Sequence, residues 1–233
     1  MDLIGIYLKE ALENSGCPVC NLLRKYERNE IGTILYEHVN NPSVREQFKE
    51  SLGLCSYHAW KLKEIAYSDP LLGSLGVAVI YDHMLSIYIE NLEQNQKIKT
   101  GRCFLCERME EKEKSIISSL SKRFAEFIGI YRDSEAILCK KHYEMLSAEL
   151  KKENTPLSEE LRKIQIMKLK EIRSRVERFI DKFDYRATKA PTKKEAEAVV
   201  LAIESLKGLP LQVNFCEISK KPSIRGVIFG NRT

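Results

Sequence analysis

The chain carries Gly16-Cys-Pro-Val-Cys20 near its start, and Gly53-Leu-Cys-Ser-Tyr-His58 follows after 34 intervening residues between the cysteines. A second pair of motifs, Cys103-Phe-Leu-Cys106 and Leu138-Cys-Lys-Lys-His142, has a similar gap of 32 residues. A leucine also stands four residues after each histidine. This agreement indicates an internal duplication that covers most of residues 15–150.

These spacings are typical of metal ligands. Two cysteines separated by two residues can both face one ion, and a Cys-x2-His pair at the start of a helix shares one helix face. Three thiolates and one imidazole complete a tetrahedral shell around Zn²⁺, and a closed shell is typical of a structural site. The sequence predicts two zinc ions, each bound by consecutive motifs: Cys17, Cys20, Cys55 and His58 in one site, and Cys103, Cys106, Cys139 and His142 in the other.

Three other chemistries fit part of this pattern. An iron–sulfur cluster can also use three cysteines and a histidine. Disulfides would leave an odd cysteine in each repeat and would not explain the two equivalent histidines. A redox-active Cys-x-x-Cys normally follows a strand, which the pattern here does not predict. Cys216 stands outside both sets, as an ordinary thiol.

The apolar periodicity predicts a mostly α fold, with two zinc-stapled helical units, C-terminal helices and a short β-like tail. We expect a long, largely buried helix over 75–96 and a helix opened by the capping box Thr192-Lys-Lys-Glu195, with the apolar stripe Val199, Val200, Ile203 and Leu206. Leu211, Val213 and Phe215 alternate as in a strand. The expected segments are 1–100 and 101–152 for the two zinc units, 153–210 for a basic helical segment and 211–233 for an extended tail.

The formal net charge of +5 is concentrated in the C-terminal third of the chain. A basic helix there could contact nucleic acid or the ribosome, and the residues that we expect to do so are Lys168, Lys170, Arg173, Arg175, Arg178 and Lys182. The competing interpretation is an ordinary solvated helix face. No segment is long and apolar enough to cross a bilayer, and the start lacks the pattern of a signal peptide, so a cytoplasmic location is expected.

The motifs resemble those of an uncharacterised prokaryotic family found in bacteria and archaea, to which no activity is assigned. The matching pieces are Gly16–Cys20, Gly53–His58, Cys103–Cys106, Leu138–His142 and a late Phe183-Asp-Tyr-Arg186, and the likeness covers most of 15–207. The resemblance implies metal binding and a helical fold, but no reaction.

The sequence therefore favours a non-enzymatic zinc protein that binds nucleic acid, the ribosome or another protein. The alternative is a metal- or thiol-dependent redox enzyme, with an iron–sulfur cluster or a reactive cysteine. No phosphate-binding glycine loop or nucleophile elbow accompanies the cysteines. Trp60, close after the first histidine, is expected to pack against the metal site and exclude water.

Overall fold

The structure is a computed structural model that describes residues 3–98, 100–186 and 189–215. Within these ranges the chain is helical, and no strand is assigned. The elements are α1 (Leu3–Glu13), α2 (Pro18–Thr33), the π-helical turn η1 (Ile34–His38), α3 (Pro42–Glu50), α4 (Ser56–Ser68), α5 (Leu75–Glu93), α6 (Phe104–Asp133), α7 (Lys140–Glu153), α8 (Thr155–Asp181), α9 (Lys193–Lys207) and α10 (Gln212–Phe215). The predicted mostly α fold is confirmed.

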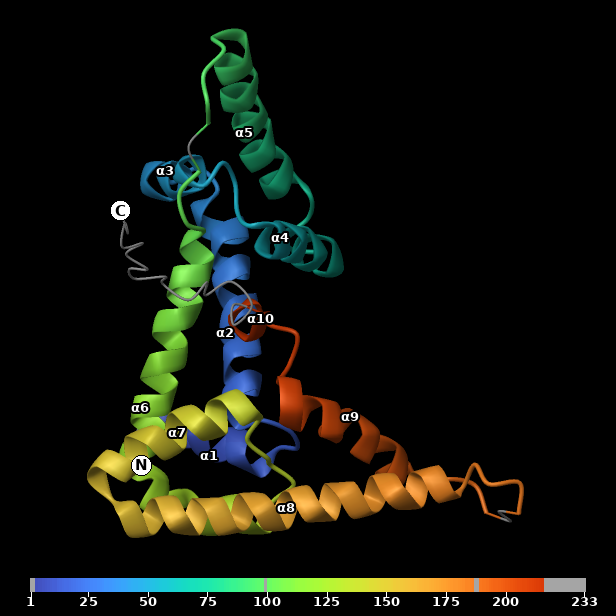
Figure 1. Cartoon of the computed structure of the whole chain (residues 1–233). Helices are drawn as coiled ribbons and strands as arrows, with labels where there is room; N and C mark the ends of the chain where they lie inside the picture. Colours follow the sequence, from blue (N-terminus) through green and yellow to red (C-terminus); the bar gives the residue numbers. More distant parts are fainter. Residues whose placement is uncertain (1–2, 99, 187–188, 216–233) are drawn as a thin grey trace, which may run out of the picture.

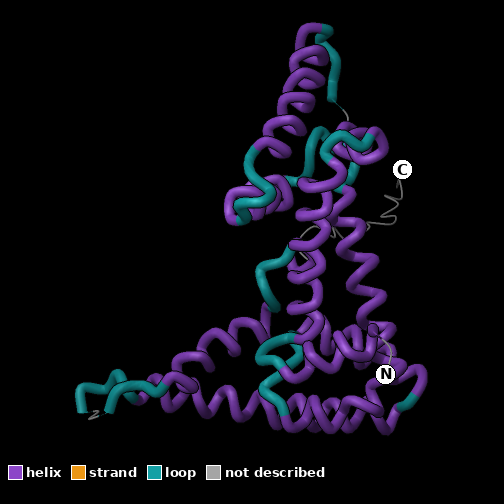
Figure 2. Tube along the Cα trace, turned by 180° about the vertical axis from the view of Figure 1, so that it is seen from behind, coloured by secondary structure: helices purple, strands orange, loops and turns teal. Residues whose placement is uncertain are grey.

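An upright pair of helices organises the molecule. Helices α2 and α6 run side by side in opposite directions, with α1 and α7 at their lower end and α3, α4 and α5 at their upper end (Figure 1). Helix α8 crosses the lower end and extends sideways as an arm, and α9 packs along it. The view from behind shows the same L-shaped outline (Figure 2).

Each end of the upright pair has its own hydrophobic core. The lower core combines α2 and α6 with later helices, through residues such as Leu23, Phe124 and Leu161. The upper core combines η1, α3, α4 and α5 with the start of α6, through residues such as Phe48 and Phe104. Burial of each such side chain contributes about 1.5–3 kcal/mol. Both cores therefore join residues from the first and second repeats.

Local sequence signals explain most helix starts. Asn41 caps α3 by accepting hydrogen bonds from the backbone N–H groups of Ser43 and Val44, which relieves unpaired donors of the first turn. The capping box of Thr192 and Glu195 opens α9 as predicted.

Two features of the fold differ from the sequence-based expectation. Helix α5 is not largely buried: only Gly76, Ile80 and Met84 of it are buried. Residues 212–215 form a short helix instead of a strand, since no strand lies beside them within the described ranges and their backbone groups bond locally. The side chains of Leu211 and Val213 are both buried in the lower core. The rest of the predicted tail, including Cys216, lies outside the described residues.

Candidate metal centres

The eight predicted ligands converge in two groups, but not in the predicted sets. One group, here the lower cluster, contains Cys17, Cys20, Cys139 and His142, and the other, the upper cluster, contains Cys55, His58, Cys103 and Cys106. In each group the ligand atoms all lie within 4.8 Å of one another. The prediction of consecutive sets is therefore wrong: each cluster takes its Cys-x2-Cys pair from one repeat and its Cys-x2-His pair from the other.

The antiparallel arrangement of α2 and α6 is the physical reason for this exchange. The Cys17 pair begins α2 at the lower end, and the Cys103 pair begins α6 at the upper end (Figure 1). The upper end also holds the start of α4, which follows α2, and the lower end holds the start of α7, which follows α6. Each end therefore collects one half of each repeat. The chain division expected at 100/101 stays a prediction, but it does not separate the clusters.

The distances within each cluster fit a tetrahedral zinc ion. A bond of about 2.3 Å to sulfur and about 2.0–2.1 Å to nitrogen gives tetrahedron edges of about 3.8 Å and about 3.6 Å. The Sγ atoms of Cys20 and Cys139 are 3.9 Å apart, and those of Cys55 and Cys106 are 3.6 Å apart. The His142 Nδ1 atom lies 3.1–3.4 Å from its three sulfurs, and the His58 Nδ1 atom lies 3.3–3.6 Å from its own three.

The sulfur separations exclude disulfides within the clusters, because an S–S bond is about 2.05 Å long. None of the six described cysteines forms a disulfide, and five of them are buried, Cys55 being partly exposed. The prediction that two Cys3His groups could hold metal ions is thus confirmed for the arrangement of the donors.

Helix N-termini favour ionised sulfur in both clusters. Cys17, Cys55, Cys103 and Cys139 are the N-cap residues of α2, α4, α6 and α7. The positive end of each helix dipole stabilises a thiolate there. Hydrogen bonds from neighbouring thiols, first that of Cys139, lower the pKa of Cys20. A thiol hydrogen bond from Cys106 does the same for the pKa of Cys103. Burial instead raises the pKa of Cys17, and the hydrogen bond to Cys103 raises the pKa of Cys106. Each cluster thus holds thiolate and thiol side by side, and a bound cation would favour the ionised form of all three sulfurs.

A buried glutamate stands behind each histidine. The Glu113 Oε1 atom lies 2.8 Å from Nε2 of His142, and the Glu27 Oε1 atom lies 3.3 Å from Nε2 of His58. The second contact lacks hydrogen-bond geometry, so we treat it as an ion-pair contact only. A carboxylate in this position fixes the ring orientation and increases the basicity of a metal-bound histidine. Neither glutamate was predicted from the sequence, although each stands seven residues after the second cysteine of its motif.

The thiols and the carboxylates together determine the protonation of the histidines. Burial lowers the pKa of His58, but hydrogen bonds to neighbouring thiols, first that of Cys103, and the carboxylate of Glu27 outweigh it and raise the pKa to about 11. The same balance raises the pKa of His142 well above its usual value. Burial raises the pKa of Glu113, but hydrogen bonds from His142 and Lys141 outweigh it, so the net shift is downward. Glu113 is therefore an ionised carboxylate.

Equivalent positions of the two repeats tie both glutamates to the C-terminal segment. Tyr57 lies 3.4 Å from Glu27 and donates a hydrogen bond of 2.9 Å to the carbonyl of Pro210. Lys141 lies 2.7 Å from Glu113 and donates a hydrogen bond of 2.7 Å to the carbonyl of Val213. Residues 210–213 thus span the upright pair between the clusters. Lys141 thus places an ammonium group beside the lower glutamate, whereas Tyr57 places a neutral hydroxyl beside the upper one.

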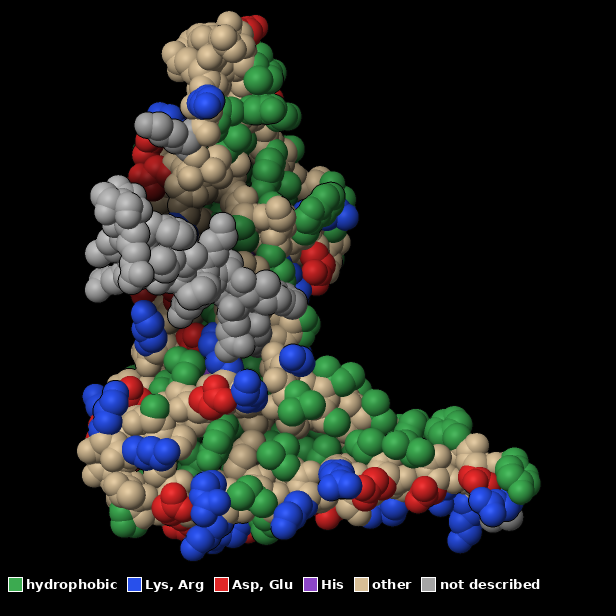
Figure 3. Space-filling model, viewed as in Figure 1, with side chains coloured by type: hydrophobic (Ala, Val, Ile, Leu, Met, Phe, Trp, Pro, Cys, Tyr) green, Lys and Arg blue, Asp and Glu red, His purple; other side chains and the backbone are tan. Residues whose placement is uncertain are grey.

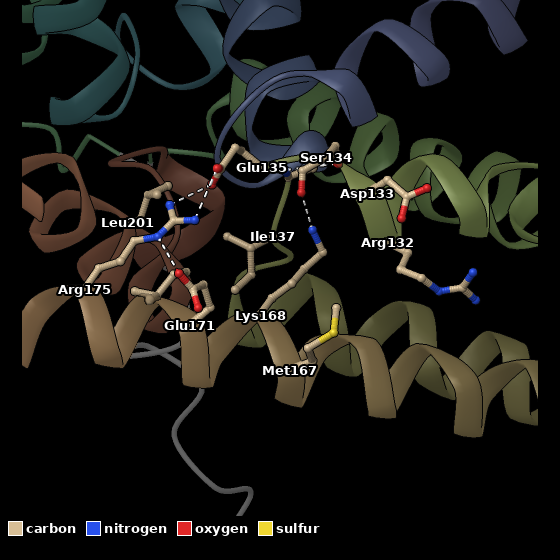
Figure 4. Close-up of a pocket in the computed structure, with 12 residues that line it drawn as sticks. Arg132, Asp133, Ser134, Glu135, Ile137, Met167, Lys168, Glu171, Arg175 and Leu201 are labelled. Atoms are coloured by element: carbon tan, nitrogen blue, oxygen red, sulfur yellow. Dashed lines mark hydrogen bonds and ion pairs between the residues drawn. The ribbon is translucent and has the colours of Figure 1, made fainter. Parts of the chain in front are cut away.

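The six basic residues expected to contact nucleic acid lie on α8 or at its end, and most of them have partners. Arg175 pairs with Glu135 at 2.9 Å and with Glu171 at 3.0 Å, beside a pocket of about 330 Å³ (Figure 4). Arg173 pairs with Glu177, and Arg178 donates to Ser174 and lies 3.8 Å from Glu195.

The two lysines nearest the arm's middle differ in exposure. Lys168 donates to the Ser134 carbonyl and lies over the ring of Tyr131, and burial lowers its pKa (Figure 4). Lys170 is exposed, and Lys182, at the C-terminus of α8, is half-buried. The six basic residues expected to contact nucleic acid therefore do not form a patch of basic side chains that lack acidic or carbonyl partners. Their contact with nucleic acid stays a prediction.

Trp60 does not cover the metal site. Its side chain is 71% exposed, so the prediction that it excludes water from the cluster is wrong. The reason is its position on α4: it follows His58 by two residues and points to a different helix face. At the far end of the arm, Phe183 and Tyr185 are also exposed, and Arg186 pairs with Asp184 at 2.9 Å.

The fold and its clusters define an all-helical protein with two Cys3His groups that could hold metal ions. The chain belongs to a family of unknown function, DUF6062, whose model matches residues 1–102 and 89–212. It is also similar to an uncharacterized 23.9 kDa protein in the xynA 3′ region of Caldicellulosiruptor sp. (strain Rt8B.4). The two are 26% identical over 209 residues, which cover 85% of this chain and 98% of the relative. No solved structure matches the chain.

Proposed function

We propose that the chain is a non-enzymatic zinc protein in which two structural ions fasten an antiparallel helix pair. The distances between donor atoms support this proposal most directly, since the sulfur–sulfur separations are close to the edges of a zinc tetrahedron and the nitrogen–sulfur separations are at most about 0.5 Å shorter. Four protein ligands leave no open position for a substrate or an activated water. The ions would act as cross-links between the repeats.

We further propose that the scaffold binds another protein. Most of the basic side chains expected to contact nucleic acid already have carboxylate or carbonyl partners, which weakens their attraction for phosphate. Large apolar side chains are exposed instead, on α4, α5 and α9 among other helices. Exposed apolar surface of this kind is typical of protein–protein contacts. No helix within the described residues is both long and apolar enough to span a membrane.

The redox alternative rests on Cys55, the one partly exposed cysteine of the two clusters. A reactive thiolate there would make the upper cluster sensitive to oxidants. The three pockets described in this structure lie along α8, between α1, α2 and α6, and beside Trp60, and no clustered cysteine or histidine lines any of them. A substrate route to the sulfurs is therefore not evident at these pockets.

The test is metal analysis of untagged protein by elemental analysis and native mass spectrometry. We expect two zinc ions per chain in the wild type, one in Cys20→Ser and one in Cys106→Ser. Cys216→Ser is the matched control and should keep two. Iron, or a wild type that retains no metal after purification without chelators, would contradict the zinc proposal.

A pull-down at increasing salt would then separate a protein partner from nucleic acid, whose binding weakens steeply with salt.

A further inference from the structure

Helices α5 and α9 each carry apolar side chains on the side opposite their buried one. On α5 these are Leu85, Ile89 and Leu92, and on α9 they are Val200, Ile203 and Leu206, each more than half exposed. We call these six residues, with Trp60 of α4, the inner face. Figure 3 shows hydrophobic side chains along one side of the upper column and along the upper side of the arm. The two sides bound the open angle of the L.

Helix α9 shows most clearly that this surface is unpartnered. Its buried side holds one large apolar residue, Leu201, beside Glu195, Ala198 and Ser205, whereas Val200, Ile203 and Leu206 face outward. More of the large apolar side chains of α9 therefore lie on the side that the described residues leave uncovered than on its buried side. A helix of this composition is typical of an element that is buried on both sides.

The total accessible surface area of the chain is large enough to indicate an uncovered contact surface. The chain exposes 15334 Å², whereas a compact monomer of 26.9 kDa exposes about 10,800 Å². The 18 residues after Phe215 would account for at most about 3,000 Å² if they exposed as much as an unfolded chain. An excess of about 1,500 Å² per chain remains, or about 3,000 Å² for two chains, which lies within the 2,000–5,000 Å² that obligate homodimers bury.

The charges of the inner face do not attract an anionic partner. Lys61 pairs with Glu64 at 2.9 Å beside Trp60, and Lys193 of α9 lies 3.7 Å from Glu197. These pairs leave the face without a dominant sign of charge, so its natural complement is apolar. Beside Trp60 lies a hollow of about 450 Å³, also lined by Tyr57 and Pro210, which could accept an apolar side chain of the partner.

We propose that a second copy of this chain covers the inner face, with α5 of each copy packed against α9 of the other. This inference rests on the protein-binding function proposed above and names its partner. The two apolar stripes lie on the two sides of one open angle, and a two-fold axis would cover both stripes of both copies in one closed assembly. Any other partner would have to supply two complementary stripes at the same separation.

Sedimentation and light scattering of the full chain test the proposal. The wild type should have twice the mass of 26.9 kDa at micromolar concentration. Ile89→Lys and Ile203→Glu should each raise the dissociation constant at least about 100-fold, because each places a charge in the apolar contact. Ile166→Glu changes an exposed residue of α8 outside the inner face and serves as the matched control.

Mixing the two variants gives the sharpest result. A heterodimer of Ile89→Lys and Ile203→Glu chains contains one wild-type contact and one Lys–Glu contact, so mixing should restore the dimer mass. A monomeric wild type with two zinc ions would overturn the dimer and leave the zinc scaffold intact. Dimers that persist in both variants would also overturn it. Loss of zinc in the wild type would instead contradict the scaffold itself.

Discussion

The exchanged ligand sets predict how the protein responds to a single cut between α5 and α6. A protease site inserted between Gln96 and Lys97 lies in exposed chain, away from both clusters. After cleavage, each zinc ion would still bind one motif from each fragment. We expect the two fragments to elute together, with two zinc ions, until a chelator is added.

In the uncut chain, both clusters close loops that contain the cleavage site, and these loops set the stability that the ions would provide before cleavage. A cross-link from Cys55 to Cys106, 51 residues apart, removes about 4 kcal/mol of chain entropy from the unfolded state, and one from Cys20 to Cys139, 119 residues apart, removes about 5 kcal/mol. The shorter loop is nested in the longer one, so together they contribute about 8 kcal/mol. Native domains are stable by about 5–15 kcal/mol, so removal of both ions should unfold much of the chain.

The assay is gel filtration of cleaved protein with and without chelator, with elemental analysis of each peak. The uncut protein is the control and should remain one species, although chelation should lower its denaturation midpoint. Separation of an N-terminal fragment that keeps one zinc ion by itself would refute the reasoning. It would show that Cys17, Cys20, Cys55 and His58 form a site within one repeat.

Three further changes have defined outcomes. Glu113→Gln should weaken zinc binding at the lower cluster by about 10–100-fold, as measured by competition with a chromophoric chelator; unchanged affinity would mean that the carboxylate does not orient His142. Tyr131→Phe removes a buried hydroxyl that accepts from the Leu138 N–H at 3.1 Å and donates to Gln165, and urea denaturation should show a loss of about 1–3 kcal/mol. A hydrogen bond from Arg175 lowers the pKa of Glu135, so this pair stabilises the fold above the unfolded pKa of about 4.3 and less as the pH falls through the lower folded value. The stability difference between wild type and Arg175→Met should therefore shrink in acid, and a pH-independent difference would argue against the ion pair.

The sequence was sufficient to select the eight side chains that converge in the two clusters, because their spacing carries the chemistry directly. It also located the starts of α4 and α7, since a Cys-x2-His pair shares one face only at the start of a helix. The sequence did not show which motifs combine in one cluster. Because the two repeats offer the same donors, each Cys-x2-Cys motif could combine with either Cys-x2-His motif, and only the direction of α6 relative to α2 decides between them. That direction depends on packing far along the chain.

The other differences between the predictions and the structure have a related cause. Glu27 and Glu113 are charged residues on helices rich in charge, and only their matching distance from the cysteines distinguishes them. Trp60 was expected to pack against the metal site because it follows His58 closely, and α5 was expected to be largely buried because apolar periodicity shows which side of a helix avoids water. It does not show whether the covering surface belongs to the same chain.

The exchanged clusters also affect the order of events during translation. Cys17, Cys20, Cys55 and His58 emerge from the ribosome first, and they form a complete donor set that matches neither native cluster. At about 5–20 residues per second, the 119 residues between Cys20 and Cys139 take roughly 6–24 s to synthesise. An ion captured early by the nascent chain would have to change ligands later, so the native metal sites would be completed only after residues 139–142 are synthesised.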